Sequence, residues 1–325
     1  MKNNLSLSIV TTIFQSENTI KSFINKIADC AKKNFGDNYE IIIVNDGSTD
    51  KSLNIAIGES KLSNKIKIVD LSRNFGHHKA IMAGLSYSNG DLVFLIDSDL
   101  EEDPELLFLF LKTIEDYNVD VIYGVQKQRK GKLFERISGE IFYRLFNAIS
   151  RINFPKNILT ARLMTRKYVD SLLLFKESEL YLLGILHITG FEQMPIKVSK
   201  KFKISSTYTI RNKLSLVINN ITSFTYRPLK LIFYFGITVT SISLFFGIVQ
   251  IVRYFLLGNT IVGWTSLIVS IWLFGGIIIS ILGILGIYLS KVFMEVKNRP
   301  HHIVKNTYVN GSVSDLVCRV NMNKN

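Results

Sequence analysis

The sequence predicts an α/β domain with a mostly parallel sheet, followed by two transmembrane helices. Three observations lead to this prediction. Strand and helix patterns alternate through the N-terminal part of the chain, two of the expected strands (IIIV and LVFLI) are apolar throughout, and two long uncharged runs follow. Strands with this continuous apolar character are typical of a parallel sheet that helices cover on both faces. The 325 residues are enough for one large domain or two smaller ones.

The expected elements follow one another in a regular order. We expect strands at 5–14, 39–46, 65–72, 90–99 and 119–124. We expect helices near 17–34, 50–61, 77–88 and 104–118. Ser16 and Ser48 are suited to cap the first two helices, and Pro104 suits a first helical turn.

Two uncharged runs near the C-terminus predict a pair of membrane spans. Residues 231–252 contain no charge, and 22 residues make a helix of about 33 Å against a hydrocarbon core of about 30 Å. Residues 254–290 are also uncharged and can hold a second span. Buried helices of a soluble core are the alternative, which uncharged runs of this length disfavour.

The charges around these runs predict four segments and their orientation. Lysine and arginine gather at the outer ends of the pair, and only Arg253 lies between the runs, so both chain ends are expected in the cytoplasm. The segments are a cytosolic α/β domain, an amphipathic juxtamembrane segment, a two-helix transmembrane hairpin and a cytosolic tail: 1–210, 211–230, 231–290 and 291–325. A nucleic-acid-binding patch is the alternative for the basic flank, but its place beside two spans favours anionic lipid headgroups.

The N-terminus and the cysteines agree with a cytoplasmic location of the first domain. The stretch MKNNLSLSIVTTIF alternates like a strand, and no small-residue cleavage site of a signal peptide follows it. The cysteines, Cys30 and Cys318, are too few and too distant for a disulfide framework or a metal cluster. We therefore expect an integral protein of the inner (plasma) membrane.

A chain of formal net charge +13 concentrates acidic residues at the end of one strand. The acids of LVFLIDSDLEEDPE are Asp97, Asp99, Glu101, Glu102, Asp103 and Glu105. Carboxylates so close together are hard to keep ionised without a cation. Asp97 and Asp99 offer hard oxygen ligands from one side, as Mg²⁺ prefers when substrate phosphates complete its coordination. They predict a divalent-metal site for a diphosphate, which Glu101 could join, whereas a solvated loop is the favoured reading for the other three acids.

Other metal and phosphate motifs fit this sequence less well. An EF-hand loop needs glycine at its sixth position and glutamate at its twelfth, where this chain has Glu102 and Phe108. The P-loop pattern G-x-x-x-x-G-K-[ST] does not occur. An aspartate-nucleophile phosphatase would place D-x-D after the first strand, whereas this motif follows the fourth. Because ligands bind beyond the carboxyl ends of parallel strands, we expect VNDGSTD and DSDLEEDPE to lie side by side.

The ordered set of motifs resembles a known family. The stretches IVTTIFQSENTI, IIIVNDGSTD, LSRNFGHHKAIMAGL and LIDSDLEEDPELL are similar to the successive motifs of family-two glycosyltransferases with the Rossmann-like GT-A fold. With paired spans and VKNRPHHIV after them, almost the whole chain resembles the polyprenyl-phosphate glycosyltransferase branch. That branch includes dolichol-phosphate mannose synthase and the bacterial undecaprenyl-phosphate glucose and aminoarabinose transferases.

The resemblance implies a function and roles for single residues. It implies an inverting transfer of a sugar from a UDP- or GDP-linked donor to a polyprenyl phosphate, with undecaprenyl phosphate as the expected acceptor, in cell-envelope glycan or lipopolysaccharide synthesis. Mg²⁺ or Mn²⁺ is the implied cofactor, and no nucleic acid is expected as a partner. Asp46 would meet the nucleobase, Asp97 the ribose or metal, and Asp99 the metal; Asp97 and Asp99 are the catalytic pair. Glu101 stands where many relatives carry a metal-contacting glutamine.

Further candidates surround this pair. Arg129 matches a region where relatives hold the acceptor phosphate, and Arg136 and Ser138 are further candidates there. His77 and His78 either shape the donor pocket or cap a helix. Glucose-transferring relatives often show G-D-F-R-L where this chain reads ILTARLM (158–164), so the resemblance does not supply the sugar.

Two other functions are alternatives to this glycosyltransferase, and the second span bears on oligomerisation. A processive polysaccharide synthase shares the fold, but its Q-x-x-R-W motif is absent. A non-catalytic membrane scaffold would not need to retain self-repelling carboxylates. Small residues of the second span (Gly276, Ser280 and Gly283) would let helices approach closely, which allows a homo-oligomer.

Overall fold

The computed structural model describes residues 5–126, 158–177, 182–198 and 263–316, with isolated residues between 232 and 256 and Cys318. The chain divides into two compact units. The first comprises Met1–Ser138, Phe154–Thr207 and Arg299–Asn325, and the second comprises Gly139–Asn153 and Tyr208–Asn298. All the elements discussed below except α10 belong to the first unit.

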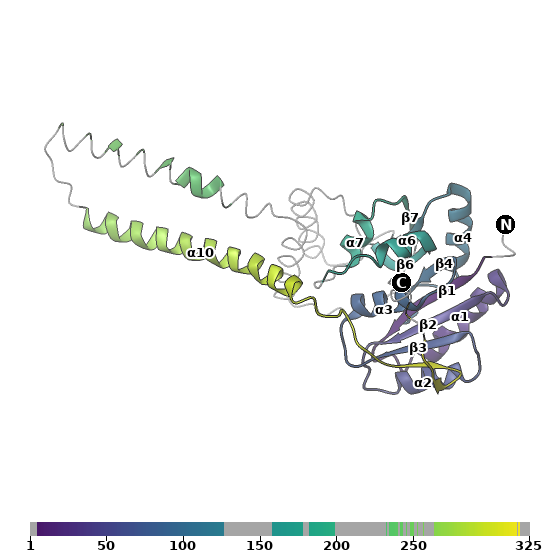
Figure 1. Ribbon diagram of the computed structural model, residues 1–325. Coiled ribbons are helices and arrows are strands. Elements are labelled where there is room, and N and C mark those ends of the chain that lie inside the picture. Colours follow the sequence, from purple (N-terminus) through teal and green to yellow (C-terminus); the bar gives the residue numbers. More distant parts are fainter. Residues whose placement is uncertain are drawn as a thin grey trace. The chain divides into compact units, whose positions relative to one another are not determined.

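The first unit is built on a sheet of nine strands in the described part of the chain, in the order β7-β5-β6-β4-β1-β2-β3-β8-β9 (Figure 1). Its strands are β1 (Leu7–Ile13), β2 (Tyr39–Asn45), β3 (Ile66–Leu71), β4 (Leu92–Leu95), β5 (Val121–Gln126), β6 (Ile158–Thr165), β7 (Gln193–Val198), β8 (Val304–Val309) and β9 (Ser312–Val313). The central strands β4, β1, β2 and β3 are parallel, whereas β6 and β8 run antiparallel to their neighbours. The predicted mostly parallel sheet is confirmed.

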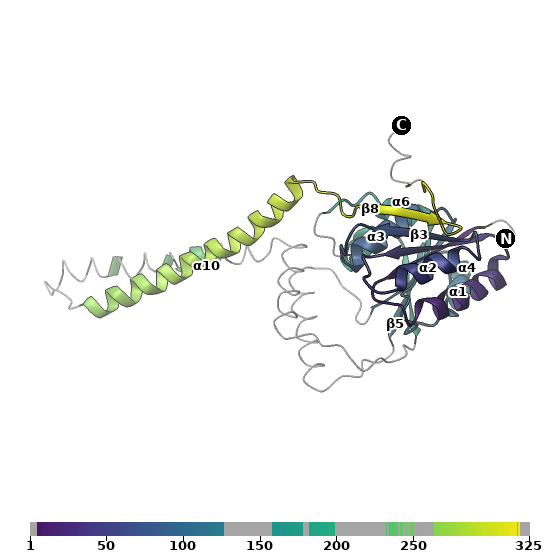
Figure 2. The same cartoon turned by 90° about the horizontal axis from the view of Figure 1, so that it is seen from below.

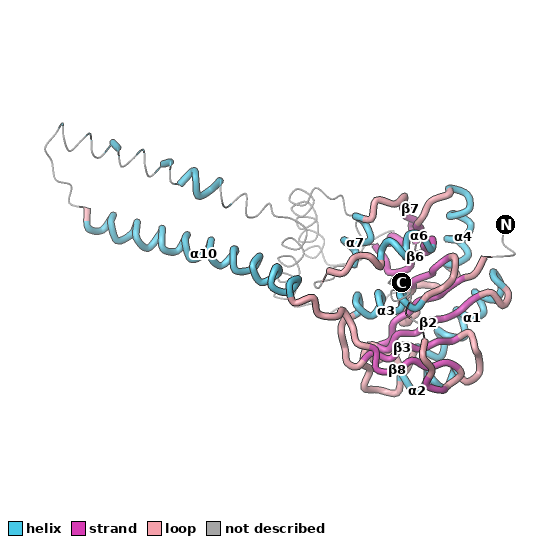
Figure 3. Tube along the Cα trace, in the orientation of Figure 1, coloured by secondary structure: helices cyan, strands magenta, loops and turns pink. Residues whose placement is uncertain are grey.

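Helices cover both faces of this sheet, as the apolar strands require (Figures 2 and 3). They are α1 (Ile20–Phe35), α2 (Ser52–Ser60), α3 (His77–Tyr87), α4 (Leu106–Tyr117), α6 (Arg166–Leu172) and α7 (Leu182–Ile188). One core cluster joins the sheet to α1, α2 and α4 through side chains such as Phe23, Ile27 and Phe110. A second cluster joins the other face to α3, α6 and α7. The result is a three-layer α/β/α arrangement.

The first helices begin later than the sequence pattern predicts. Thr19, not Ser16, is the N-cap of α1, and the carbonyl of Ser16 accepts the backbone N–H of Thr19. Lys51 is the N-cap of α2, and the carboxylate of Asp50 accepts the backbone N–H of Ser52 at 3.1 Å. The predicted caps at Ser16 and Ser48 are therefore wrong, because an extra turn separates each strand from its helix.

The tail expected over 291–325 contains two strands of the sheet. β8 lies antiparallel to β3, with Thr307 opposite Val69, and β9 pairs with β8. The backbone N–H of Gly311 donates to the hydroxyl of Ser60 at 3.1 Å. The C-terminal segment thereby covers an edge that β3 would otherwise expose to other strands.

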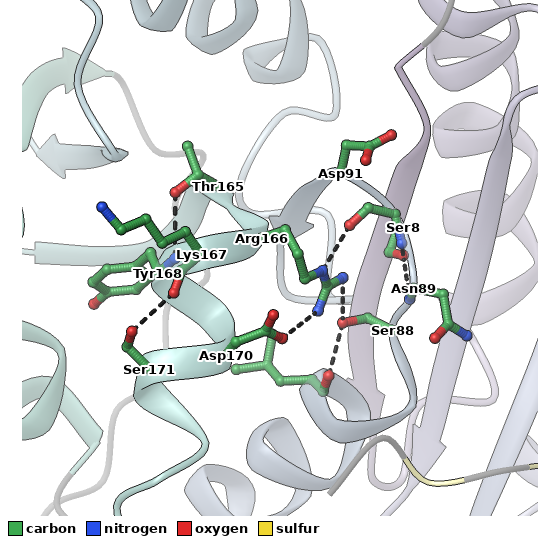
Figure 4. Close-up of polar contacts among 12 residues, drawn as sticks. Ser8, Ser88, Asn89, Asp91, Thr165, Arg166, Lys167, Tyr168, Asp170 and Ser171 are labelled. Atoms are coloured by element: carbon green, nitrogen blue, oxygen red, sulfur yellow. Dashed lines mark hydrogen bonds and ion pairs between the residues drawn. The ribbon is translucent and has the colours of Figure 1, made fainter. Parts of the chain in front are cut away.

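An arginine fastens the amino end of β4 (Figure 4). Nε of Arg166 donates to the carbonyl of Gly90 at 2.8 Å, and its Nη2 donates to the hydroxyl of Ser88 at 3.1 Å. Its Nη1 lies 3.6 Å from Oδ1 of Asp170. Because β6 runs antiparallel to β4, the end of β6 lies beside the amino end of β4. Arg166, which follows β6, is therefore far from the carboxyl end of β4. Its contacts are those of a structural residue.

The second unit contains α10 (Trp264–Val296). No helix among the described residues meets both the length and the hydropathy needed to cross a membrane. The predicted pair of spans stays a prediction, and the predicted juxtamembrane segment 211–230 lies outside the described residues.

Candidate functional site

The acidic turn, defined here as residues 97–102, begins just beyond the carboxyl end of β4. Ser98 is buried, with 4% of its surface exposed, and its hydroxyl donates to the carbonyl of Thr12 at 2.8 Å. Leu100 has a left-handed backbone with φ of 60°, which is rare for a bulky residue, and its side chain packs against the core. Oδ1 of Asp99 accepts the backbone N–H of Glu101 at 3.0 Å. These contacts hold the turn in one conformation before any substrate binds.

His77 connects the acidic turn to the neighbouring strand β1. Its Nε2 lies 3.4 Å from Oδ1 of Asp97, and its Nδ1 lies 3.1 Å from the hydroxyl of Thr12. The N-cap of α3 is Gly76, and His77 is the first helical residue. The sequence predicts that His77 either shapes the donor pocket or caps a helix. The prediction of a helix cap is wrong. Its contact with Asp97 places it beside the acidic turn, and its role in a donor pocket stays a prediction.

Asp46 holds the loop that precedes α3. This residue follows β2 and is 3% exposed. Its Oδ1 accepts the backbone N–H of Phe75 at 2.7 Å, and its Oδ2 accepts that of Gly76 at 3.0 Å. Hydrogen bonds to a carboxylate are stronger than neutral ones, so this loop is fixed to the end of β2. The predicted contact of Asp46 with a nucleobase stays a prediction.

The expectation of a solvated loop is wrong for Glu102. Its side chain is buried, with 1% exposed, and its two carboxylate oxygens accept the backbone N–H groups of Thr160 and Ala161 at 3.0 and 2.9 Å. Antiparallel β6 brings its first residues to the carboxyl end of β4, where they meet the acidic turn. Glu105 is exposed, as expected.

Asp97 and Asp99 fit a divalent cation whose coordination a substrate completes. Among the described residues, no three histidine, cysteine or acidic side chains are grouped so that they could hold a metal ion. Mg²⁺ commonly takes only one or two carboxylates from a protein and its remaining ligands from substrate phosphates and water. Two aspartates on one fixed turn suit that donor set. The place of Glu101 as a third ligand stays a prediction.

The candidate residues for the acceptor phosphate, Arg129, Arg136 and Ser138, lie outside the described residues. Their segment, 127–157, is flanked by β5 and β6, and Val125 of β5 pairs with Ile158 of β6. Both flanking positions lie at the carboxyl edge of the sheet that also carries the acidic turn. The segment thus leaves and re-enters the described structure beside the candidate site.

The structure gives three residues contacts that the sequence does not predict. They are the link of His77 to Asp97, the burial of Glu102, and the burial of Arg162 within ILTARLM. A usable signal existed for Arg162, because a lone arginine in the apolar run ILTARLM predicts a buried charge that needs partners. No local signal distinguishes Glu102 from its acidic neighbours.

Comparisons with known proteins show the family of this chain. Residues 8–173 match the family model described as Glycosyl transferase family 2. A Mycobacterium tuberculosis (strain CDC 1551 / Oshkosh) protein, described among glycosyltransferases, is 42% identical over 304 residues, which cover 94% of this chain and 89% of the relative. The SfII prophage-derived bactoprenol glucosyl transferase of Shigella flexneri is 31% identical over 309 residues, which cover 94% of this chain and 99% of the relative.

A solved structure gives a weaker likeness. The crystal structure of glucosyl-3-phosphoglycerate synthase from Mycobacterium tuberculosis in complex with UDP has a TM-score of 0.48 and 17% identity, and the match covers 69% of this chain and 80% of that chain. At this distance the likeness adds nothing to the match with the family.

Proposed function

The chain belongs to glycosyl transferase family 2, and from this premise we propose that it is a membrane-bound, inverting glycosyltransferase that uses a polyprenyl phosphate as acceptor. The donor is a UDP- or GDP-linked sugar, and undecaprenyl phosphate is the expected acceptor. The observation that carries the proposal is the acidic turn, which presents Asp97 and Asp99 at the carboxyl edge of the sheet. The near full-length match with a bactoprenol glucosyl transferase supports the lipid acceptor.

Asp97 and Asp99 act on the nucleotide-sugar donor. They would hold a Mg²⁺ or Mn²⁺ ion, with Glu101 as a further candidate ligand. A bound divalent ion supplies charge neutralisation for a leaving nucleoside diphosphate. The chain's own contribution is to position the two carboxylates. The hydrogen bond to the N–H of Glu101 orients Asp99, and His77 lies beside Asp97.

The reaction is a single displacement. An oxygen of the lipid phosphate attacks the anomeric carbon, and the bond between that carbon and the nucleoside diphosphate breaks. The configuration inverts, so an α-linked donor gives a β-linked lipid product. A phosphate monoester has a second pKa of about 6, so it is largely dianionic at neutral pH and needs little help from a base.

Transfer to lipid is tested directly with membranes that contain the protein. Radiolabelled UDP- and GDP-sugars are incubated with these membranes and undecaprenyl phosphate, and the lipid is then extracted. We expect one donor to give a labelled, phosphate-linked lipid. Label in a long polysaccharide would favour the processive synthase, and nucleotide-sugar binding without any transfer would favour the scaffold.

Replacing Arg129 with alanine is expected to weaken acceptor binding. A charge-assisted contact with phosphate contributes about 1.5–3 kcal/mol, so the KM for undecaprenyl phosphate should rise roughly ten- to a hundredfold. The KM for the donor should change far less. Both constants are measured in detergent with purified enzyme.

Lys130 supplies a matched control, because Lys130→Ala removes a positive charge from the adjacent position. We expect this variant to change the acceptor KM less than Arg129→Ala does. Equal increases in both KM values for Arg129→Ala would count against a specific contact with the acceptor.

The proposal includes two membrane spans with the enzyme on the cytoplasmic side. It is supported by the uncharged runs 231–252 and 254–290 and by the basic residues that flank them. Large apolar side chains of α10, among them Leu267, Leu282 and Leu289, are exposed and call for an apolar environment. A polyprenyl phosphate presents its phosphate at such a membrane surface.

The hairpin orientation is tested with single cysteines in a cysteine-free background. Burial raises the pKa of the Cys30 thiol, so native Cys30 is a poor reporter. Leu62 is 81% exposed, and Leu62→Cys reports on the first domain. In right-side-out vesicles we expect a membrane-impermeant thiol reagent to label Asn259→Cys but not Leu62→Cys, and to label both after permeabilisation. Labelling of Leu62→Cys in sealed vesicles would overturn the orientation.

A further inference from the structure

Strand β6 carries a buried arginine next to the acidic turn. Arg162 is 3% exposed and lies opposite Leu95, the last residue of β4. The acidic turn starts two residues after Leu95. Burying a guanidinium in an apolar layer costs free energy unless hydrogen bonds and opposite charge surround it. Its surroundings therefore indicate what this arginine does.

Arg162 and Glu102 bind the same short stretch of backbone. Nε of Arg162 donates to the carbonyl of Thr160 at 3.1 Å, and its Nη2 donates to the carbonyl of Leu159 at 3.2 Å. Glu102 accepts the N–H groups of Thr160 and Ala161. The first residues of β6 are thus held from two sides. The Arg162 guanidinium binds their carbonyl groups, and the Glu102 carboxylate binds their N–H groups.

The charge of Arg162 also acts on the acidic turn. Burial lowers the pKa of this guanidinium, and the neighbouring Tyr168, Glu102, Tyr123 and Asp97 oppose that effect. An arginine side chain keeps its positive charge in proteins. This charge attracts Asp97 at the start of the acidic turn and Glu102 at its end.

This arrangement answers a physical problem of the candidate site. Carboxylates on one short turn repel each other, and this repulsion favours an open turn when no cation is bound. A buried positive charge behind the turn offsets that repulsion without occupying the place of a ligand. Glu102, which points away from solvent, ties the far end of the turn to β6.

We propose that Arg162 and Glu102 are positioning residues that hold the acidic turn in the geometry needed to bind a divalent cation together with a nucleoside diphosphate. This inference rests on the proposed function and extends it to residues that do not touch the substrate. It predicts an effect on the donor side of the reaction and none on the acceptor side.

The test compares two arginines that each donate to a backbone carbonyl. Arg162→Gln removes the charge next to the acidic turn. Arg166→Gln removes an arginine that also binds a backbone carbonyl, but at the opposite edge of the sheet. Binding of Mn²⁺ with UDP, and of Mn²⁺ with GDP, is measured by calorimetry on purified protein, and thermal unfolding is measured in parallel.

We expect both variants to unfold at a lower temperature, but only Arg162→Gln to weaken Mn²⁺–nucleotide binding, by at least tenfold. Glu102→Gln should weaken it in the same direction, because an amide cannot accept both N–H groups. Arg162→Lys keeps the charge and should recover part of the affinity. If Arg162→Gln does not fold, Glu102→Gln alone tests the proposal. In steady-state assays the donor KM should rise while the acceptor KM stays within twofold.

One result would overturn the proposal. If folded Arg162→Gln and Glu102→Gln bind Mn²⁺–nucleotide as the wild type does, these residues only stabilise the fold. This outcome is distinct from failure of the proposed function, which would appear as wild-type protein that binds nucleotide but forms no lipid-linked sugar.

Discussion

Asp99→Asn is expected to abolish sugar transfer while the fold stays intact. Asparagine has nearly the same shape, and its Oδ1 can still accept the backbone N–H of Glu101, which Asp99 binds at 3.0 Å. The acidic turn should therefore persist with one negative charge fewer. Loss of a group that stabilises charge in the transition state commonly lowers kcat by about a hundred- to a thousandfold. Initial rates with the preferred donor measure the loss of transfer, and circular dichroism of the same sample shows whether the fold is intact.

Asp103→Asn provides the matched control. Oδ1 of Asp103 accepts the backbone N–H of Glu105 at 3.1 Å, so the local hydrogen-bonding pattern is the same, outside the candidate metal ligands. We expect this variant to retain activity within about twofold. If Asp99→Asn keeps activity within a factor of two of the wild type, Asp99 is not an essential metal ligand.

The sequence was informative where structure is determined by local patterns. The parallel strands β1 to β4 are marked by apolar runs, and their helices by apolar residues at helical spacing, so the sequence predicted where these elements lie along the chain. The acidic turn was placed correctly because a parallel sheet brings the carboxyl ends of its strands to one edge. Neither inference needs knowledge of distant contacts.

The remaining strands depend on contacts that no local pattern reveals. β6 contains a buried arginine, β7 contains Pro195, and β8 is a polar strand that reaches the sheet only after α10 in sequence. None of the three has the uninterrupted apolar run that marks β2 and β4. Glu102 shows the same limit within the site, since its burial depends on β6, which pairs with β4 from more than 50 residues further along the chain.

Gly47→Ala is expected to cause the largest loss of stability among single substitutions in the candidate site. Gly47 has φ of 68°, and a Cβ built there would lie 2.4 Å from the backbone nitrogen of Asn74 and 2.5 Å from the carbonyl carbon of Arg73. Left-handed backbone costs alanine about 1–2 kcal/mol. The clash is with backbone, which cannot rotate away, so the two loops must separate.

Separation of these loops removes the contacts that Asp46 makes. Its carboxylate binds the N–H groups of Phe75 and Gly76, just beyond the clash, and each hydrogen bond to a charged group contributes about 1.5–3 kcal/mol. With the strained backbone, the free energy of unfolding should fall by at least about 3 kcal/mol. Because the same loop leads to His77 and hence to Asp97, Mn²⁺–nucleotide binding should weaken as well.

Thermal unfolding in detergent measures this loss against a control in the adjacent helix. A Cβ at Gly58 of α2 meets nothing within 4 Å, so Gly58→Ala should leave the fold unstrained and raise the free energy of unfolding by about 0.5–1 kcal/mol. The two alanines therefore shift the unfolding temperature in opposite directions. A Gly47→Ala protein that unfolds with the wild type and binds nucleotide normally would show that the loops after β2 and β3 can separate without harm, and that Asp46 does not fix the donor side of the site.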